Sequence, residues 1–179
     1  VHEGLRAVAV LMVLLYHVGL PGLDGGFAGV DVFFVISGYL ITAHLLAKPP
    51  SGVMDLGRFW ARRIHRLLPA ALSVLAVTAV ATRLVAPSTQ WANTGKEIIA
   101  SALYVENWRL AASSVDYLAE DQAPSPVQHY WSLSIEEQFY LGWPIVLLAL
   151  FLLARLVRRR TTVVVVSGMA LVIVASLWY

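Results

Sequence analysis

The sequence has 179 residues, of which 59% are hydrophobic and only 13% are charged, and its formal net charge is +2. A soluble domain carries about a quarter charged residues, and here the apolar residues stand in runs rather than stripes, so composition favours a membrane protein. The small net charge gives no indication of nucleic-acid binding. The chain has no cysteine, which excludes disulfides and thiolate sites.

Five long apolar segments predict an all-α, polytopic bundle of membrane helices. They cover residues 5–20, 28–47, 67–86, 138–157 and 161–179 approximately, and each approaches the ~20 residues that a helix needs to cross a bilayer. The first segment also fits the apolar part of a signal peptide, but "GLPGLDGG" follows it where a small-residue cleavage site is needed. Because the chain starts at Val1 and stops inside an apolar run, we expect a fragment of a longer protein.

Basic residues predict which ends of these segments face the cytoplasm. If the N-terminus and the loops after the second and fourth segments lie on one side, that side carries ten of the thirteen lysines and arginines. An excess of these residues marks the cytoplasmic side, so we predict a cytoplasmic N-terminus, a basic cytoplasmic loop at 48–66 and an extracytoplasmic segment at 87–137. Residues 48–66 combine arginines with aromatic side chains, which is typical of an amphipathic helix lying on the membrane face. Part of residues 87–137 is semi-apolar and is compatible with a re-entrant element.

Arg6 and His17 lie on one face of the first predicted helix. They are eleven residues apart, which corresponds to about 16 Å along the axis and an angular offset of about 20°. A ligand with an anionic head and a long arm would fit this geometry, with its head at Arg6 and its reactive end at His17. The alternative is that Arg6 anchors the helix at the interface and that His17 donates a hydrogen bond to another helix.

Two further groups of charged residues suggest chemistry. Arg63 and Arg66 are three residues apart and share a helix face, which suits phosphate binding, although contact with anionic lipid explains them equally well. In "SIEE", Ser134 and Glu137 match a helix-capping box, which leaves Glu136 unexplained. An acid entering a membrane helix is a candidate to orient an imidazole or take a proton; the alternative is that Glu136 faces exterior water.

The second segment contributes weaker candidates. Asp31 stands in its outer part at a depth similar to that of His17. The run Ser37-Gly38-Tyr39 reads first as a small-residue packing site, and Gly26 and Gly29 indicate turns or close helix packing. No histidine and carboxylate residues have the spacing of a metal site, so we expect no metal.

Four blocks of the sequence together resemble the membrane acyltransferase-3 family. They are "GLRAVAVLMVLLYH", "GGFAGVDVFFVISGYLIT", "FWARRIHRLLPA" and "HYWSLSIEEQFYLGWP", in that order. The resemblance implies a bacterial enzyme of the cytoplasmic membrane that O-acylates envelope carbohydrates such as lipopolysaccharide, peptidoglycan or exopolysaccharide. It also implies a domain of about ten spans, of which this chain resembles the N-terminal half, and a possible fused or partner SGNH-type domain.

The resemblance further implies roles for individual residues. Arg6, Arg63 and Arg66 would engage the phosphates of an acyl-CoA donor, expected to be acetyl-CoA, at the cytoplasmic face. His17 would be the catalytic base or a transient acyl carrier. Glu136 or Glu137 would support proton transfer on the acceptor side, and Asp31, Ser37 and Tyr39 would line the site.

The leading hypothesis is therefore an integral-membrane O-acyltransferase that moves an acyl group, expected to be acetyl, from acyl-CoA to a carbohydrate hydroxyl. A non-enzymatic transporter or channel is the alternative, with Arg6, His17, Asp31 and Glu136 lining a polar path. A transporter is expected to show repeated, broken spans, and no such repeat is visible. A lipid-binding scaffold would use only the basic helix and would not need Arg6 and His17 on one face.

Overall fold

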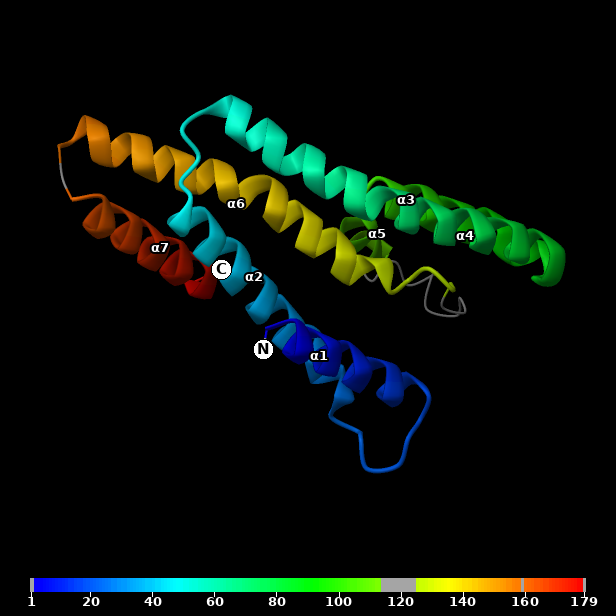
Figure 1. Ribbon diagram of the computed structural model, residues 1–179. Helices are drawn as coiled ribbons and strands as arrows, with labels where there is room; N and C mark the ends of the chain where they lie inside the picture. Colours follow the sequence, from blue (N-terminus) through cyan, green and yellow to red (C-terminus); the bar gives the residue numbers. More distant parts are fainter. Residues whose placement is uncertain (1, 114–124, 159, 179) are drawn as a thin grey trace.

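The computed structural model describes residues 2–113, 125–158 and 160–178, which form seven α-helices, one short 3-10 helix and no strand. Figure 1 shows α1 beside α2, α3 running along α6, and α7 packed on the second half of α6. The helices are α1 (His2–His17), α2 (Gly29–Ala47), α3 (Val53–Val85), α4 (Ser88–Ala102), α5 (Glu106–Ser113), α6 (Tyr130–Leu156) and α7 (Thr161–Trp178), and η1 (Gly26–Ala28) precedes α2.

Four of the five predicted spans fall in helices that are long and apolar enough to cross a membrane, namely α2, α3, α6 and α7. The fifth, predicted at residues 5–20, is the shorter apolar helix α1, which ends at His17. Gly19 and Gly22, both with positive φ, follow in the turns between α1 and η1. The described residues thus form an all-helical, polytopic membrane protein, as the sequence predicts.

The basic segment 48–66 is not a separate surface element. From Val53 onward it forms the first part of α3, which continues without a break to Val85. Pro69 lies inside this helix; it removes one backbone N–H donor but leaves the helix continuous here. The helix predicted within 48–66 is present, but it does not end at residue 66, because the composition changes from basic to apolar there while the backbone hydrogen bonding continues.

Two glycines set the close approach of α1 and the start of α2. A Cβ atom at Gly26 would collide with the backbone carbonyl of Met12, and one at Gly29 would collide with the carbonyl of Ala9. Only a residue without a side chain fits at such a contact. The predicted packing role of Gly26 and Gly29 is therefore confirmed, and it fixes α2 against the helix that carries Arg6 and His17.

The buried core joins α2, α6 and α7, whereas the outer helix faces are apolar and exposed. Its buried side chains are Ile41, Leu45, Tyr140, Leu147, Phe151 and Val165. Large apolar side chains on α3 and α7, such as Val77, Leu84 and Leu177, remain exposed. This surface suits contact with hydrocarbon, since lipid carries no penalty for exposed apolar groups.

The described part of the segment predicted as extracytoplasmic, 87–137, packs closely on the bundle. α4 folds back along the second half of α3, and α5 lies against α6 (Figure 1). We call α4, α5 and the turn between them the elbow. The re-entrant element stays a prediction, and residues 114–124 of the segment lie outside the described residues. The cytoplasmic position of the N-terminus stays a prediction.

Candidate active site

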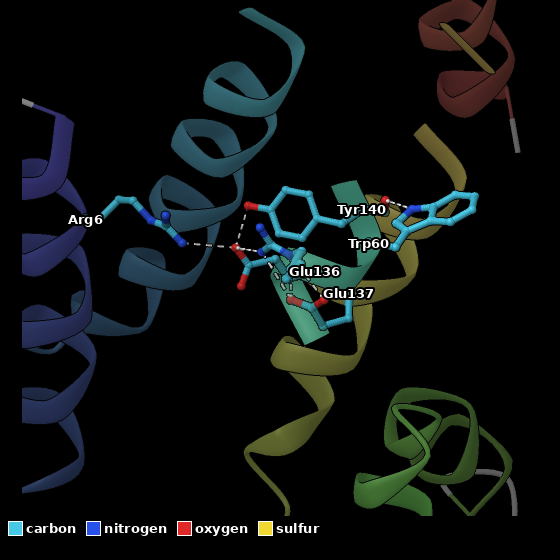
Figure 2. Close-up of polar contacts among 6 residues, drawn as sticks. Arg6, Trp60, Glu136, Glu137 and Tyr140 are labelled. Atoms are coloured by element: carbon cyan, nitrogen blue, oxygen red, sulfur yellow. Dashed lines mark hydrogen bonds and ion pairs between the residues drawn. The ribbon is translucent and has the colours of Figure 1, made fainter. Parts of the chain in front are cut away.

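Two adjacent carboxylates on α6, Glu136 and Glu137, are held by arginines from two other helices. Nη2 of Arg6 lies 3.1 Å from Oε1 of Glu136, and Nη2 of Arg63 lies 3.8 Å from the same oxygen. Arg63 also donates from Nε to both oxygens of Glu137, at 3.1 and 3.2 Å. Figure 2 shows Arg6 reaching Glu136 from a helix opposite α6. These four side chains, the charge network, join α1, α3 and α6.

The charge network is balanced, with two positive and two negative groups in a largely buried position. The Glu136 side chain is 5% exposed, and the Arg6 side chain is 33% exposed. Removing charges from water costs several kcal/mol per ion, and only a complete set of opposite charges and hydrogen bonds offsets that cost. The network is therefore expected to stabilise the helix arrangement only while all four members are present.

Two aromatic residues complete the surroundings of this network. The Tyr140 hydroxyl donates to Oε1 of Glu136 at 2.7 Å, and the guanidinium of Arg63 stacks 3.2 Å above the Tyr140 ring. The indole of Trp60, one turn before Arg63, donates to the Tyr140 carbonyl at 3.2 Å (Figure 2). Cation–π contact and hydrogen bonding together fix the guanidinium of Arg63 in one orientation.

The capping box predicted for Ser134 and Glu137 is wrong. α6 begins at Tyr130, one turn earlier, so Ser134 lies inside the helix and its hydroxyl bonds the Tyr130 carbonyl. Glu137 is free to pair with Arg63 for that reason. The alternative in which Glu136 faces exterior water is also wrong, because Glu136 is buried.

The arginines and glutamates occupy one site, whereas we expected them at opposite ends of the enzyme. Arg6 and Arg63 are engaged by Glu136 and Glu137 rather than forming a purely cationic cluster. Arg66, expected beside Arg63, is exposed on α3 and outside the charge network. A guanidinium has five N–H donors, and the partly exposed Arg6 uses one of its Nη atoms for Glu136, so it has donors left for a ligand anion.

The imidazole of His17 ends α1 and is fixed in one tautomer. Its Nδ1 lies 2.8 Å from the carbonyl oxygen of Val13. A carbonyl oxygen can only accept, so Nδ1 carries the proton and Nε2 of the neutral ring is an acceptor. His17 is exposed. Because α1 is continuous from Arg6 to His17, the two residues are separated by about 16 Å along the helix axis.

A second imidazole, that of His129, lies against His17 and was not assigned a role from the sequence. The two rings meet edge to face with centroids 4.6 Å apart, at the point where α6 begins. Burial and the neighbouring His17 lower the pKa of His129 from its usual 6.5, so this ring is neutral at pH 7. Nothing in the sequence spacing connects residues 17 and 129, since they meet only through tertiary packing.

The remaining candidates lie on α2. Ser37 is buried on the face that carries Ile41 and Leu45 and packs against α6. Asp31, in the first turn, and Tyr39 are exposed. In the described ranges, no group of three or more histidine, cysteine or acidic side chains could hold a metal ion.

The sequence analysis did not identify Tyr140 and Trp60, the two aromatic residues beside the charge network. Each lies one helical turn from a residue that the sequence did single out, Glu136 and Arg63 respectively. A search for aromatic side chains at three- and four-residue spacing from candidate charges would have found them.

The fold and site define an integral-membrane helical protein with a buried charge network and an exposed histidine at the end of the short apolar helix α1. The acyltransferase domain family matches residues 3–179, and the chain belongs to that family. This agrees with the resemblance carried by the four sequence blocks, and it leaves the transporter or channel alternative without support.

Curated relatives agree with the family assignment. The chain is 47% identical over 151 residues to "Putative O-acetyltransferase SACOL0978" of Staphylococcus aureus (strain COL), covering 84% of this chain and 25% of that protein. It is 44% identical over 146 residues to "O-acetyltransferase OatA" of Staphylococcus aureus (strain NCTC 8325 / PS 47), covering 81% of this chain and 24% of that protein. The chain thus spans about a quarter of the length of these relatives. No solved structure matches it.

Proposed function

We propose that this chain forms part of a membrane O-acyltransferase that moves an acetyl group from acetyl-CoA to a hydroxyl of an envelope carbohydrate. The observation that carries the proposal is the pair of functional groups on α1. An acceptor nitrogen is available at His17, and a guanidinium with spare donors stands at Arg6, about 16 Å away along one helix. The relatives are named O-acetyltransferases, which supports acetyl as the transferred group and an ester as the product.

At the donor end, Arg6, Arg63 and Arg66 contact the phosphates of the coenzyme. Glu136 and Glu137 orient the first two guanidiniums, and the exposed Arg66 adds a positive charge that the network does not cancel. Binding energy from the distant phosphates positions the thioester near His17. Separation of the two ends by about 16 Å, from the helix rise, is of the order of a pantetheine arm.

At the reacting end, Nε2 of His17 takes the proton of the acceptor hydroxyl as the oxygen attacks the thioester carbonyl carbon. The carbon–sulfur bond breaks, and the thiolate leaves and receives the proton from the imidazolium, giving ester and free coenzyme thiol. If the imidazole attacks first, Nε2 bonds to the acetyl carbon as the carbon–sulfur bond breaks and the thiolate leaves. The acceptor oxygen then displaces Nε2, and the hydroxyl proton neutralises the thiolate, giving the same ester and thiol. Asp31, Ser37 and Tyr39 line the acceptor path. An SGNH-type domain elsewhere in the full-length protein is a candidate partner.

The test is transfer of radiolabelled acetyl from acetyl-CoA in membranes that contain the full-length protein. His17→Ala is compared with wild type and with His65→Ala, which removes an exposed imidazole from α3. We expect His17→Ala to lower transfer by at least about 100-fold at equal expression, while His65→Ala leaves it unchanged. Label on the wild-type protein itself would indicate the acyl-carrier route. Equal transfer by wild type and His17→Ala would overturn the proposal.

A further inference from the structure

A second buried polar cluster lies in the elbow, away from the charge network. Glu97 on α4 accepts hydrogen bonds from Asn93 at 3.0 Å and from Arg109 on α5 at 3.4 Å, and it also accepts one from the Ser125 hydroxyl. Arg109 further donates to Asn93 at 2.5 Å. The carboxylate of Glu97 is therefore matched by one guanidinium and two neutral donors, and it needs no further partner.

Glu106, the first residue of α5, has no such partners. Its side chain is fully buried, and neither carboxylate oxygen has a hydrogen-bond partner. The described structure has five buried side-chain polar atoms without a partner, and four of them belong to Ser101, Glu106 and Arg109 of the elbow. Unsatisfied buried polar groups are rare in native proteins, and a fully buried carboxyl without a partner is far more costly when it is ionised than when it is neutral.

The charges around Glu106 favour its neutral form. α4 contributes the carboxylate of Glu97, and α5 contributes the guanidinium of Arg109. Burial and the negative charge of Glu97 raise the pKa of Glu106 by more than the positive charge of Arg109 lowers it. Facing this part of α5, the segment before α6 presents the uncharged Ser125, and α6 presents the uncharged Gln138. Two carboxylates thus share one guanidinium, and that guanidinium is already bound to Glu97. An ionised Glu106 would be a buried charge without compensation.

We propose that Glu106 is a proton-binding site, at which one bound proton keeps the carboxyl neutral and holds the elbow against α6. A proton removes the excess negative charge without moving any side chain. A metal cation fits less well, because Arg109 stands in the same cluster, and the described residues hold no group of three histidine, cysteine or acidic side chains that could bind one. The proposal does not depend on acyl transfer.

The elbow is also attached to the charge network, so this proton bears on the candidate active site. The Gln138 amide donates from Nε2 to the Tyr104 carbonyl at 2.7 Å and to Asn107 at 2.9 Å, and its oxygen accepts from Asn107 and Trp108 at 3.2 Å each. Tyr104 has a φ of 55°, which is unusual for a residue with a side chain. Gln138 directly follows Glu137, so loosening of the elbow would free the α6 surface beside that carboxylate.

The direction of the pH dependence follows from the burial of Glu106, which raises the pKa of this carboxyl from 4.5 to about 7. A carboxyl whose pKa is higher in the folded than in the unfolded state stabilises the fold below the unfolded value. That contribution is lost as the pH rises through the folded value. The elbow is therefore expected to be tightest below pH 4.5 and to loosen up to and beyond about pH 7.

Hydrogen–deuterium exchange of the full-length protein in lipid nanodiscs tests this, with labelling times scaled for the pH dependence of chemical exchange. For peptides covering residues 103–113 we expect opening to increase at least about tenfold between pH 5 and pH 8 in wild type. In Glu106→Gln the increase disappears. In Glu97→Gln it shrinks, because Arg109 becomes available to Glu106. Lys96→Gln, which removes an exposed charge from α4, keeps the wild-type behaviour.

A second measurement does not depend on how well Glu106→Gln folds. Infrared difference spectra over the same pH range should contain the carbonyl stretch of a protonated carboxyl in wild type, titrating at lower pH in Glu97→Gln. The proposal is overturned if opening of the wild-type elbow does not change with pH. It is also overturned if the increase in opening survives in Glu106→Gln, or if the carboxyl band is absent. A midpoint that moves with added Na⁺ or Ca²⁺ would also overturn it, in favour of a cation site.

Discussion

The charge network and the elbow bury charge in two different ways. In the charge network, Glu136 and Glu137 meet two arginines, from α1 and α3. In the elbow, Glu97 and Glu106 share the single guanidinium of Arg109. The first arrangement joins three helices with matched charges, and the second leaves one acid that needs a proton. Matched charge makes the charge network sensitive to mutation, while unmatched charge makes the elbow sensitive to pH.

Loss of Arg63 is expected to have the largest effect on stability. Arg63→Met leaves Glu136 and Glu137 with only Arg6, and breaking a buried pair on one side costs about 3–5 kcal/mol. Thermal unfolding of the full-length protein in detergent measures this, with the exposed neighbour Arg62→Met as the control. Adding Glu137→Gln to Arg63→Met should recover part of the loss. If Arg63→Met and Arg62→Met unfold at the same temperature, the charge network does not hold α3 to α6.

Loss of Arg109 is expected to cost less than loss of Arg63. Arg109→Met removes the ion pair with Glu97 and the hydrogen bond to Asn93, but Asn93 and Ser125 continue to donate to the Glu97 carboxylate. Hydrogen bonds to charged groups contribute about 1.5–3 kcal/mol. The same unfolding assay gives the order of the two effects. A loss larger than that of Arg63→Met would mean that the elbow, rather than the charge network, is the more tightly balanced region.

Loss of the Tyr140 hydroxyl should be smaller still. Tyr140→Phe keeps the ring under the Arg63 guanidinium but removes one donor to the buried Glu136. Because Arg6 still donates to the same oxygen, the cost is about 1.5 kcal/mol, the low end for a hydrogen bond to a charged group. Tyr16→Phe, an exposed tyrosine on α1, is the matched control. Equal unfolding temperatures for the two variants would show that another donor replaces the phenol.

The Trp60 indole is expected to make the smallest contribution of this series. Trp60→Phe removes a neutral hydrogen bond to the Tyr140 carbonyl, a type of bond with a net contribution of about 1 kcal/mol. Trp178→Phe, at an exposed position on α7, serves as its control. A loss as large as that of Arg63→Met would indicate that Trp60 positions Arg63 rather than only bonding α6.

The apolar runs were sufficient to predict the membrane helices, because length and hydropathy alone decide whether a helix can span. They were not sufficient for helix ends. α3 begins fourteen residues before the predicted span at residue 67, since a basic stretch and an apolar one can share a single helix. The start of α6 was misplaced for a related reason, because Ser134 matches a cap by pattern but lies inside the helix.

The members of the charge network were singled out one by one in the sequence, but their arrangement was not predicted. Arg6, Arg63, Glu136 and Glu137 were all identified, yet we assigned the arginines and glutamates to opposite ends of the reaction path. Their pairing depends on how α1, α3 and α6 cross, which no local pattern contains. Glu106 was not identified at all, because in sequence it is an ordinary acid at the start of a short helix, and only its burial makes it unusual.

Chemical rescue tests whether the imidazole of His17 performs the proton or acyl transfer. Acetyl transfer by the full-length His17→Ala variant is measured with and without added imidazole. We expect a loss of at least about 100-fold that free imidazole partly restores, because the position of the removed side chain is exposed beside His129. Transfer by His17→Ala at the wild-type rate without imidazole would contradict the claim.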